Sequence, residues 1–162
     1  MNIWTERLER RHLPIVEAWL GRRDGALTPN DLPENAAALP GWFEDCAAEA
    51  GSLDCVVLVY ETPVGLAGLR RQSGRETAAE LYLLLCEKNY NPLRTATYAA
   101  LRMLDRAFLE QGLERVSVRA DERQAWFLET LEKMGFVRRA EGDGLIALTV
   151  EKAAFLDRKY LF

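Results

Sequence analysis

The stretch 79-AELYLLLCEKNYNPLRTATYAALRMLDRAF-108 decides the fold, because its apolar pattern changes from that of a strand to that of a helix. The run from Leu81 to Cys86 is apolar apart from the hydroxyl of Tyr82, which is typical of a strand covered on both faces of a sheet. Pro92 disfavours helix in the residue before it, so we expect regular helix from about Leu93. The apolar positions that follow have helical spacing: Ala96, Ala99, Ala100, Met103, Leu104, Ala107 and Phe108. The stretch therefore predicts a buried strand, a loop and a long helix that lies on the sheet.

A strand that leads through a loop into a helix is also an arrangement that binds phosphate. The first turn of a helix has unpaired N–H groups and a partial positive charge of roughly half a unit. Neither GxxxxGK[ST] nor GxGxxG is present, and no glycine lies between Gly74 and Gly112. Most strand-loop-helix connections bind nothing, so the arrangement alone leaves both interpretations open.

Residues Asn91 to Thr97 resemble the acyl-CoA loop of the GNAT superfamily of N-acyltransferases, whose pattern is Gln/Arg-x-x-Gly-x-Gly/Ala. Asn91 stands at the Gln/Arg position, Arg94 at the first glycine and Ala96 at the last position. In the family, that first glycine lets the backbone close around the pyrophosphate of coenzyme A. Arg94 either offers its guanidinium to a phosphate, for which its planar fork is suited, or blocks the site.

Two further segments resemble the family in the expected order. Val56 to Arg70 is similar to its second and third strands, with Gly65 to Leu69 as the small-residue segment G-x-x-G-L. Gln124 to Phe136 is similar to the segment N-x-x-A-x-x-L-Y-E-K-L-G-F that follows the fifth strand. Here Gln124 replaces the usual Asn, and Leu131 replaces the Tyr that often serves as general acid.

The opening segment His12 to Leu20 resembles the D-L-P-x-x-x-x-W-L opening of GNAT members that act on amino sugars or polyamines, with His12 in place of Asp. His12 is the only histidine, and we expect it to cap or flank a first helix rather than to act as a base. Altogether the resemblance covers about Ile3 to Val150.

The resemblance implies an α/β fold with one mixed sheet of about seven mostly antiparallel strands. Strands four and five are expected to be parallel and splayed, and about four helices to flank the sheet. We expect a single domain over residues 1–162, since a chain of this length buries about 70% of its extended surface. Local patterns add a polar loop at 71–77, a hairpin turn at 141–144 and turn chemistry at 21–33. In the helix after the fifth strand, Ala125, Leu128, Leu131 and Met134 are expected to face inward.

Composition excludes several classes of protein. Hydrophobic residues make up 49% and charged residues 28% of the chain, and no apolar run approaches the ~20 residues of a membrane span. A net charge of −4 argues against nucleic acid as the main partner. We therefore expect a cytoplasmic protein with no membrane contact, whose three cysteines, Cys46, Cys55 and Cys86, are reduced and mostly buried.

The resemblance implies acetyl-CoA as cosubstrate and no metal. The pyrophosphate of coenzyme A is expected to lie against the backbone of Leu93 to Thr97, and its pantetheine arm is expected to lie along Leu84 to Cys86 as an added strand. The side chain of Gln124 is expected to contact that arm. The full set expected to hold coenzyme A is Leu84, Leu85, Cys86, Asn91, Leu93, Arg94, Thr95, Ala96, Thr97 and Gln124.

For catalysis the family commonly uses a carboxylate on the fourth strand, which here is Glu80. Alternation places Glu80, Tyr82 and Leu84 on one face, so Tyr82 is its expected catalytic companion. The alternative is that Glu80 ends the strand at the surface and pairs with an arginine. Trp42 and Phe43, on an expected helix at 34–50, are interpreted either as core or as walls of the acceptor pocket.

The expected reaction is acetyl transfer to a primary amine of a small molecule, amino sugar or polyamine-like, or of a protein N-terminus. The alternative is a non-catalytic binding or regulatory module on the same scaffold, favoured by Arg94 and Leu131. At the C-terminus, Tyr160, Leu161 and Phe162 leave apolar groups that must dock on the domain or on a second subunit, so we also consider a homodimer.

Overall fold

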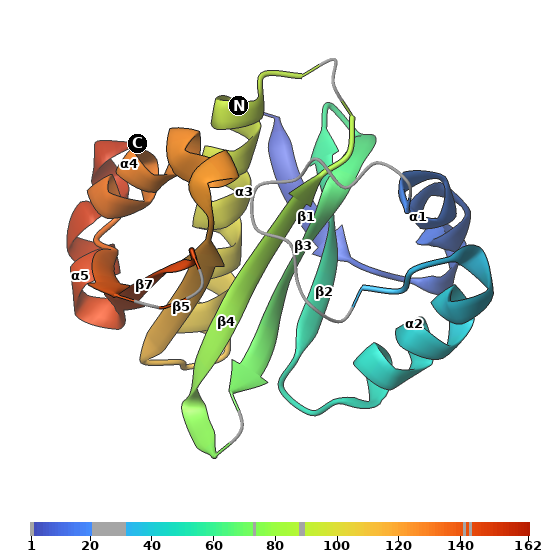
Figure 1. Ribbon diagram of the computed structural model, residues 1–162, viewed down its shortest axis with the longest axis horizontal. Helices are drawn as coiled ribbons and strands as arrows, with labels where there is room; N and C mark the ends of the chain where they lie inside the picture. Colours follow the sequence, from blue (N-terminus) through green and yellow to red (C-terminus); the bar gives the residue numbers. More distant parts are fainter. Residues whose placement is uncertain (1, 21–31, 73, 88–89, 141, 143) are drawn as a thin grey trace.

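The computed structural model describes residues 2–20, 32–72, 74–87, 90–140, 142 and 144–162. The predicted turn segment at 21–33 falls mostly outside these residues, and so does part of the predicted turn at 141–144. One seven-stranded sheet runs through the molecule in the order β1-β2-β3-β4-β5-β7-β6 (Figure 1). Its strands are β1 (Ile3–Arg7), β2 (Leu53–Val59), β3 (Thr62–Gln72), β4 (Arg75–Leu85), β5 (Arg115–Ala120), β6 (Val137–Ala140) and β7 (Ile146–Glu151).

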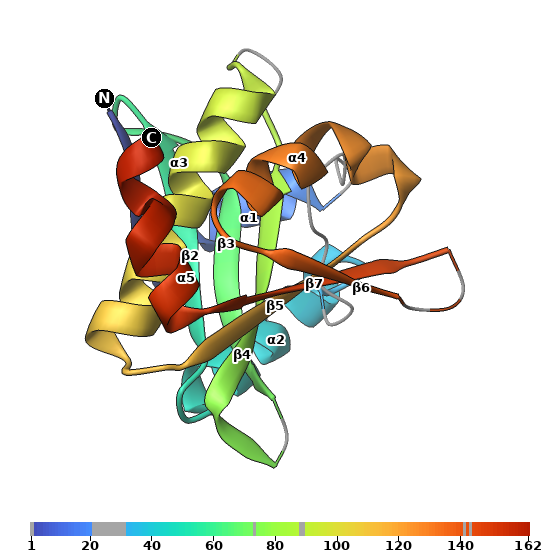
Figure 2. The same ribbon diagram turned by 90° about the vertical axis from the view of Figure 1, so that its left-hand side faces the viewer.

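Five α-helices flank the sheet within the described residues, one more than the sequence predicts. They are α1 (Leu13–Trp19), α2 (Leu39–Ala48), α3 (Pro92–Asp105), α4 (Ala125–Lys133) and α5 (Lys152–Arg158). A π-helical turn, Arg106–Glu110, continues α3. The helices α1 and α2 lie on one side of the sheet and α3, α4 and α5 on the other (Figures 1 and 2).

Among the described strands, β4 and β5 are the only parallel pair, as predicted. The two strands pair over a short length, Ala78–Glu80 against Arg115–Ser117, and diverge beyond it (Figure 1). On its other side, β4 continues to pair with β3 as far as Leu85. The segment 81–85 therefore has strand partners on one side and an opening on the other.

The predicted apolar stripe of α3 is confirmed. Every residue of the stripe is buried and belongs to the larger core, which lies between the sheet and the helices α3, α4 and α5. A smaller core lies under α1 and α2 and includes Tyr82 and Leu84. The prediction for α4 is wrong at one position, since Ala125 is exposed and Phe127 is fully buried instead.

The predicted polar loop at 71–77 is mostly strand. Gln72 pairs with Arg75, and Gly74 makes the turn between β3 and β4 with φ of +75°. The two strands project past the short β5, where polar residues on the outer positions of a hairpin are solvated. Polarity alone therefore gave the wrong boundary.

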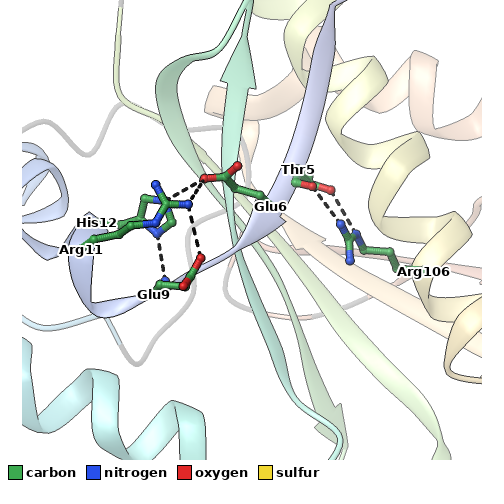
Figure 3. Close-up of polar contacts among 6 residues, drawn as sticks. All are labelled: Thr5, Glu6, Glu9, Arg11, His12 and Arg106. Atoms are coloured by element: carbon green, nitrogen blue, oxygen red, sulfur yellow. Dashed lines mark hydrogen bonds and ion pairs between the residues drawn. The ribbon is translucent and has the colours of Figure 1, made fainter.

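The outer edge of strand β1 is covered by two arginine side chains, one from α3 and one from the π-helical turn that continues it. Leu8 N–H donates to Asp54 O, so the backbone groups of Leu8 point toward β2. In an antiparallel pair this direction alternates from residue to residue, and the backbone groups of Ile3 and Thr5 therefore point away from β2. Arg106 donates to the carbonyl of Thr5 at 2.8 Å and to its hydroxyl at 3.1 Å (Figure 3). Arg102 lies 3.4 Å from the carbonyl of Ile3. Such covering protects an edge strand from pairing with another chain.

At the C-terminus, Tyr160 is 83% and Leu161 72% exposed, so neither docks on its own chain. The homodimer stays a prediction. No helix among the described residues has both the length and the apolar character to cross a membrane. The three cysteines are buried, and burial raises the pKa of Cys55 to about 11, which keeps it a thiol.

Candidate active site

The loop after β4 leads into a helix start that caps itself. Asn91 accepts the Arg94 N–H with its side-chain oxygen at 3.0 Å, and the Thr95 N–H with its backbone oxygen at 3.0 Å. Pro92, the first helical residue, has no N–H to give. The Asn91 side chain thus occupies a donor that an incoming phosphate would use. A phosphate bound here must displace that side chain or use the remaining donors.

The remaining residues of the predicted pyrophosphate loop fall into two groups. Asn91, Leu93 and Arg94 are exposed, whereas Thr95, Ala96 and Thr97 are buried. The hydroxyl of Thr97 donates to the Leu93 carbonyl at 2.6 Å, inside the helix. Beside the helix start lies a cavity of about 240 Å³, lined by Asn2, Ile3, Val59, Tyr60, Tyr90, Asn91, Arg94 and Thr95. Arg94 therefore lines a hollow between α3 and the ends of β1 and β2.

At the end of β4, Leu84 and Cys86 are buried under α1 and α2, while Leu85 is partly buried on the opposite face. Cys86 N–H donates to Val64 O at 2.8 Å, which holds the strand end against β3. Glu87 then accepts the indole N–H of Trp19 at 2.9 Å and ties α1 to the same place. The end of β4 that is predicted to bind the pantetheine arm is therefore held by β3 along one edge. Its other edge borders the opening between β4 and β5.

Gln124 is buried at the start of α4, across the opening from β4. Its side-chain oxygen accepts Asp121 N–H at 2.7 Å, in a capping box whose other half is Asp121. Hydrogen bonds from Arg123 lower the pKa of Asp121, so that carboxylate stays ionised at the helix N-terminus. The capping role uses the amide oxygen of Gln124, and no residue that the structure describes accepts a hydrogen bond from its two N–H donors.

Glu80 belongs to the last parallel pair before the strands diverge. Its carboxylate oxygen Oε1 accepts hydrogen bonds from Nε and Nη2 of Arg119 at 3.1 and 3.0 Å. The side chains are 29% and 40% exposed, so this pair is accessible from solvent. The structure thus contains the arginine pair that the sequence left open as an alternative, and the catalytic role of Glu80 stays a prediction.

Tyr82 lies on the same face as Glu80 but is turned into the smaller core. Its hydroxyl donates to Asp54 Oδ1 at 2.6 Å, and Arg70 donates to the same oxygen at 2.6 Å. Burial, and then the Asp54 charge, raise the pKa of Tyr82 well above its ordinary value. The ring covers Gly68, where a Cβ atom would sit 1.9 Å from it. Tyr82 is therefore a protonated donor to Asp54, and its role as catalytic companion is not tested by this geometry.

The two aromatic residues of α2 have different positions. Trp42 is buried in the smaller core, and its indole N–H has no hydrogen-bond partner in the described part of the chain. Phe43 is partly buried and lines a cavity of about 120 Å³ together with Arg7, Leu8, Cys46, Ala47, Ser52 and Asp54. Packing thus explains Trp42, while Phe43 also borders a hollow.

His12 is a structural residue, as expected. Nδ1 accepts the Glu9 N–H at 2.9 Å, so the neutral ring carries its proton on Nε2, which lies 2.9 Å from Glu6 Oε1 (Figure 3). The hydrogen bond from His12, followed by that from Arg11, lowers the pKa of Glu6. The ring is buried and both nitrogens are used.

We expect His12→Ala to leave kcat unchanged and to lower the free energy of unfolding by about 1–3 kcal/mol, because the variant loses the two hydrogen bonds of the buried ring, each worth about 0.5–1.5 kcal/mol. The loss should shrink as the pH falls below about 4.3, the ordinary value for Glu, since a lowered folded pKa stabilises only while Glu6 is ionised. Urea unfolding at several pH values, with steady-state kinetics, measures both effects. A large loss of kcat in a folded variant would give His12 a catalytic role.

Sequence reasoning missed three charged residues at the site: Asp54, Arg70 and Arg119. Asp54 interrupts the apolar run of β2, and a carboxylate there predicts a buried partner. Arg119 is separated from Glu80 by 39 positions, and the sequence has no signal for that contact.

No group of three His, Cys, Asp or Glu side chains among the described residues is arranged to hold a metal ion.

A family model described as "Acetyltransferase (GNAT) domain" matches residues 6–137. None of the curated proteins searched matches the chain.

Several solved structures share the fold. Mutant forms of the spermidine/spermine N-acetyltransferase SpeG from Vibrio cholerae align at 16% identity over 98% of each chain, with a TM-score of 0.80. The spermidine N-acetyltransferase from the same organism in complex with CoA and spermine aligns at 15% identity, over 96% of this chain and 98% of that one, with a TM-score of 0.80. The family match covers most of the chain, and the fold agrees with it. The chain therefore belongs to the GNAT acetyltransferase family and is an N-acyltransferase of that family.

Proposed function

We propose that the protein transfers the acetyl group of acetyl-CoA to a primary amine of a small molecule. The observation that carries this is the divergence of β4 from β5 after Glu80, next to the start of α3. A strand with one open edge suits the amide-bearing pantetheine arm, and a helix start suits a pyrophosphate. These two features lie at successive positions of one strand-loop-helix unit. The structural neighbour that binds CoA and spermine supports the same reaction class.

In this proposal the pantetheine arm lies along Leu84 to Cys86 and the pyrophosphate lies against Leu93 to Thr97. Gln124, on the far side of the opening, offers its amide N–H groups to the arm. The thioester then lies near the point where the strands diverge, beside Glu80.

Glu80 acts as general base. It removes a proton from the acceptor ammonium, directly or through water, and the free amine attacks the thioester carbonyl. A tetrahedral oxyanion forms, the carbon–sulfur bond breaks, and the amide and the CoA thiolate are the products. The attacking nitrogen loses its second proton as the amide forms, and the thiolate takes up that proton to give free CoA. The protein's contribution is to hold both reactants and to direct the proton.

Calorimetric titration with acetyl-CoA and release of free CoA over an amine panel test this proposal. Micromolar binding together with amine-dependent release supports it. Binding of acetyl-CoA with no release of free CoA in the presence of every amine of the panel would contradict it.

We expect Arg94→Ala to weaken acetyl-CoA binding by about 10- to 150-fold and to reduce its salt dependence, because one charge-assisted phosphate contact is worth about 1.5–3 kcal/mol. Titration at two salt concentrations measures this. Arg94→Gly is the matched variant, since it restores the glycine of the family pattern. Stronger binding by Arg94→Gly than by the wild type would mean that the Arg94 side chain obstructs the site.

A further inference from the structure

Two arginines lie in one row across the sheet beside Glu80. Arg119 of β5 pairs with Ala147 of β7, and Ala147 pairs in turn with Arg139 of β6. Directly paired residues point to the same face, so both arginines stand on one face with the small Ala147 between them. Their Cα atoms are two strand spacings apart, roughly 10 Å.

This face is open to solvent over the described residues. The alternate residues of β5 and β7, such as Val116, Val118 and Leu148, are fully buried against α3, α4 and α5. In contrast, Arg119 and Arg139 are exposed, and Ala147 is partly exposed. The β6–β7 hairpin extends beyond the helices (Figure 2). A bound molecule can therefore reach the row from the side of Glu80.

Of the two arginines in this row, only Arg119 has an acidic partner among the described residues. Glu80 is paired with Arg119, Asp54 with Arg70, and Glu151 with Arg115. Arg139 makes no ion pair with the part of the chain that the structure describes. A second ammonium of the acceptor would meet arginine here, whereas an anionic group would meet two planar forks suited to its oxygens.

We infer that the acceptor is an amine that also carries an anionic group, a carboxylate or a phosphate, which binds between Arg119 and Arg139 over Ala147. This rests on the proposed function, because Glu80 as base places the acceptor amine beside Arg119. Binding of the anion also competes for Arg119 and so frees the Glu80 carboxylate to take the proton. The preferred acceptor thus differs in charge from the spermine bound by the structural neighbour.

The test compares four amines of matched length: 6-aminohexanoate, a 6-carbon aminoalkyl phosphate, 1,6-diaminohexane and hexylamine. We expect kcat/KM for the better anionic amine to exceed that for the diamine by at least about tenfold, and the two anionic amines to show which group is preferred. Arg139→Gln should remove about tenfold of that preference, which is about 1.4 kcal/mol, with hexylamine unchanged. Arg139→Lys should restore part of it.

Arg138→Gln is the matched control, since Arg138 is the adjacent residue, points to the other face and pairs with Glu132. It should leave the preference unchanged. A diamine preference, an equal effect of Arg139→Gln on all four amines, or an effect of Arg138→Gln of the same size would overturn the inference.

Failure of the proposed function gives a different result. In that case no amine is acetylated, and the readout is the thermal stabilisation of the CoA-loaded protein by the same four amines. Stabilisation by an anionic amine that is lost in Arg139→Gln supports the anion site without the reaction. No such stabilisation would refute the anion site as well.

Discussion

Glu80→Gln is expected to lower kcat by about 10²- to 10⁴-fold while acetyl-CoA binding stays within about twofold of the wild type. The substitution keeps the shape of the side chain and removes its ability to accept a proton, and general base catalysis contributes a factor of this size. Because the base acts only after both substrates are bound, the effect belongs in kcat. Single-turnover kinetics with saturating acetyl-CoA, together with calorimetry, measures both quantities.

Glu80→Gln also breaks an ion pair, so its control must do the same away from the opening. Glu151→Gln does this, since Glu151 accepts Arg115 Nε at 2.8 Å between neighbouring strands of the same sheet. We expect the control to retain kcat. If Glu80→Gln retains kcat as well, Glu80 is only the partner of Arg119 and the base is elsewhere.

Asp54→Ala is expected to lower the free energy of unfolding by about 3–5 kcal/mol. The Asp54 side chain is 7% exposed and holds both Arg70, which is 16% exposed, and the Tyr82 hydroxyl. Removing one partner leaves a guanidinium and a phenol without their acceptor in the smaller core, which costs more than the pair itself contributes. Urea unfolding followed by tryptophan fluorescence measures the loss.

The control removes the whole group instead of one member. A triple variant with Asp54→Leu, Arg70→Met and Tyr82→Phe should recover most of the lost stability, because apolar residues of similar volume avoid burying a charge. A single Asp54→Ala variant as stable as the wild type would show that solvent reaches this group and that the pair is not a buried one.

The fold could be predicted from the sequence because its signals are local. The stripe from Ala96 to Phe108 fixes which side of α3 meets the sheet, and burial of every position confirms it. In the shorter helix α4 the same rule fails at Ala125, because a small residue at the first position can stay exposed while Phe127 supplies the buried surface. A short helix contains too few apolar positions for the sequence to determine which of its sides faces the core.

The site was predicted less completely, because it depends on contacts between distant strands. The sequence identifies Glu80 as a carboxylate on the central strand, but the partner Arg119 follows only from the register of β5. Likewise Asn91 could be assigned to the loop, whereas its hydrogen bond to Arg94 N–H follows from the backbone angles of the cap. Side-chain chemistry is local, and pairing across a sheet is not.

The arginine cover of β1 has a consequence for the order in which the chain folds. Thr5 and Arg106 are separated by 101 positions, so the carbonyl of Thr5 receives its donor only after α3 has been made and has docked. Until then the first strand has an unprotected edge, even if β2 is already paired with it. Contacts of such sequence separation form slowly. During synthesis the N-terminal strand is therefore exposed to wrong strand partners until α3 has docked.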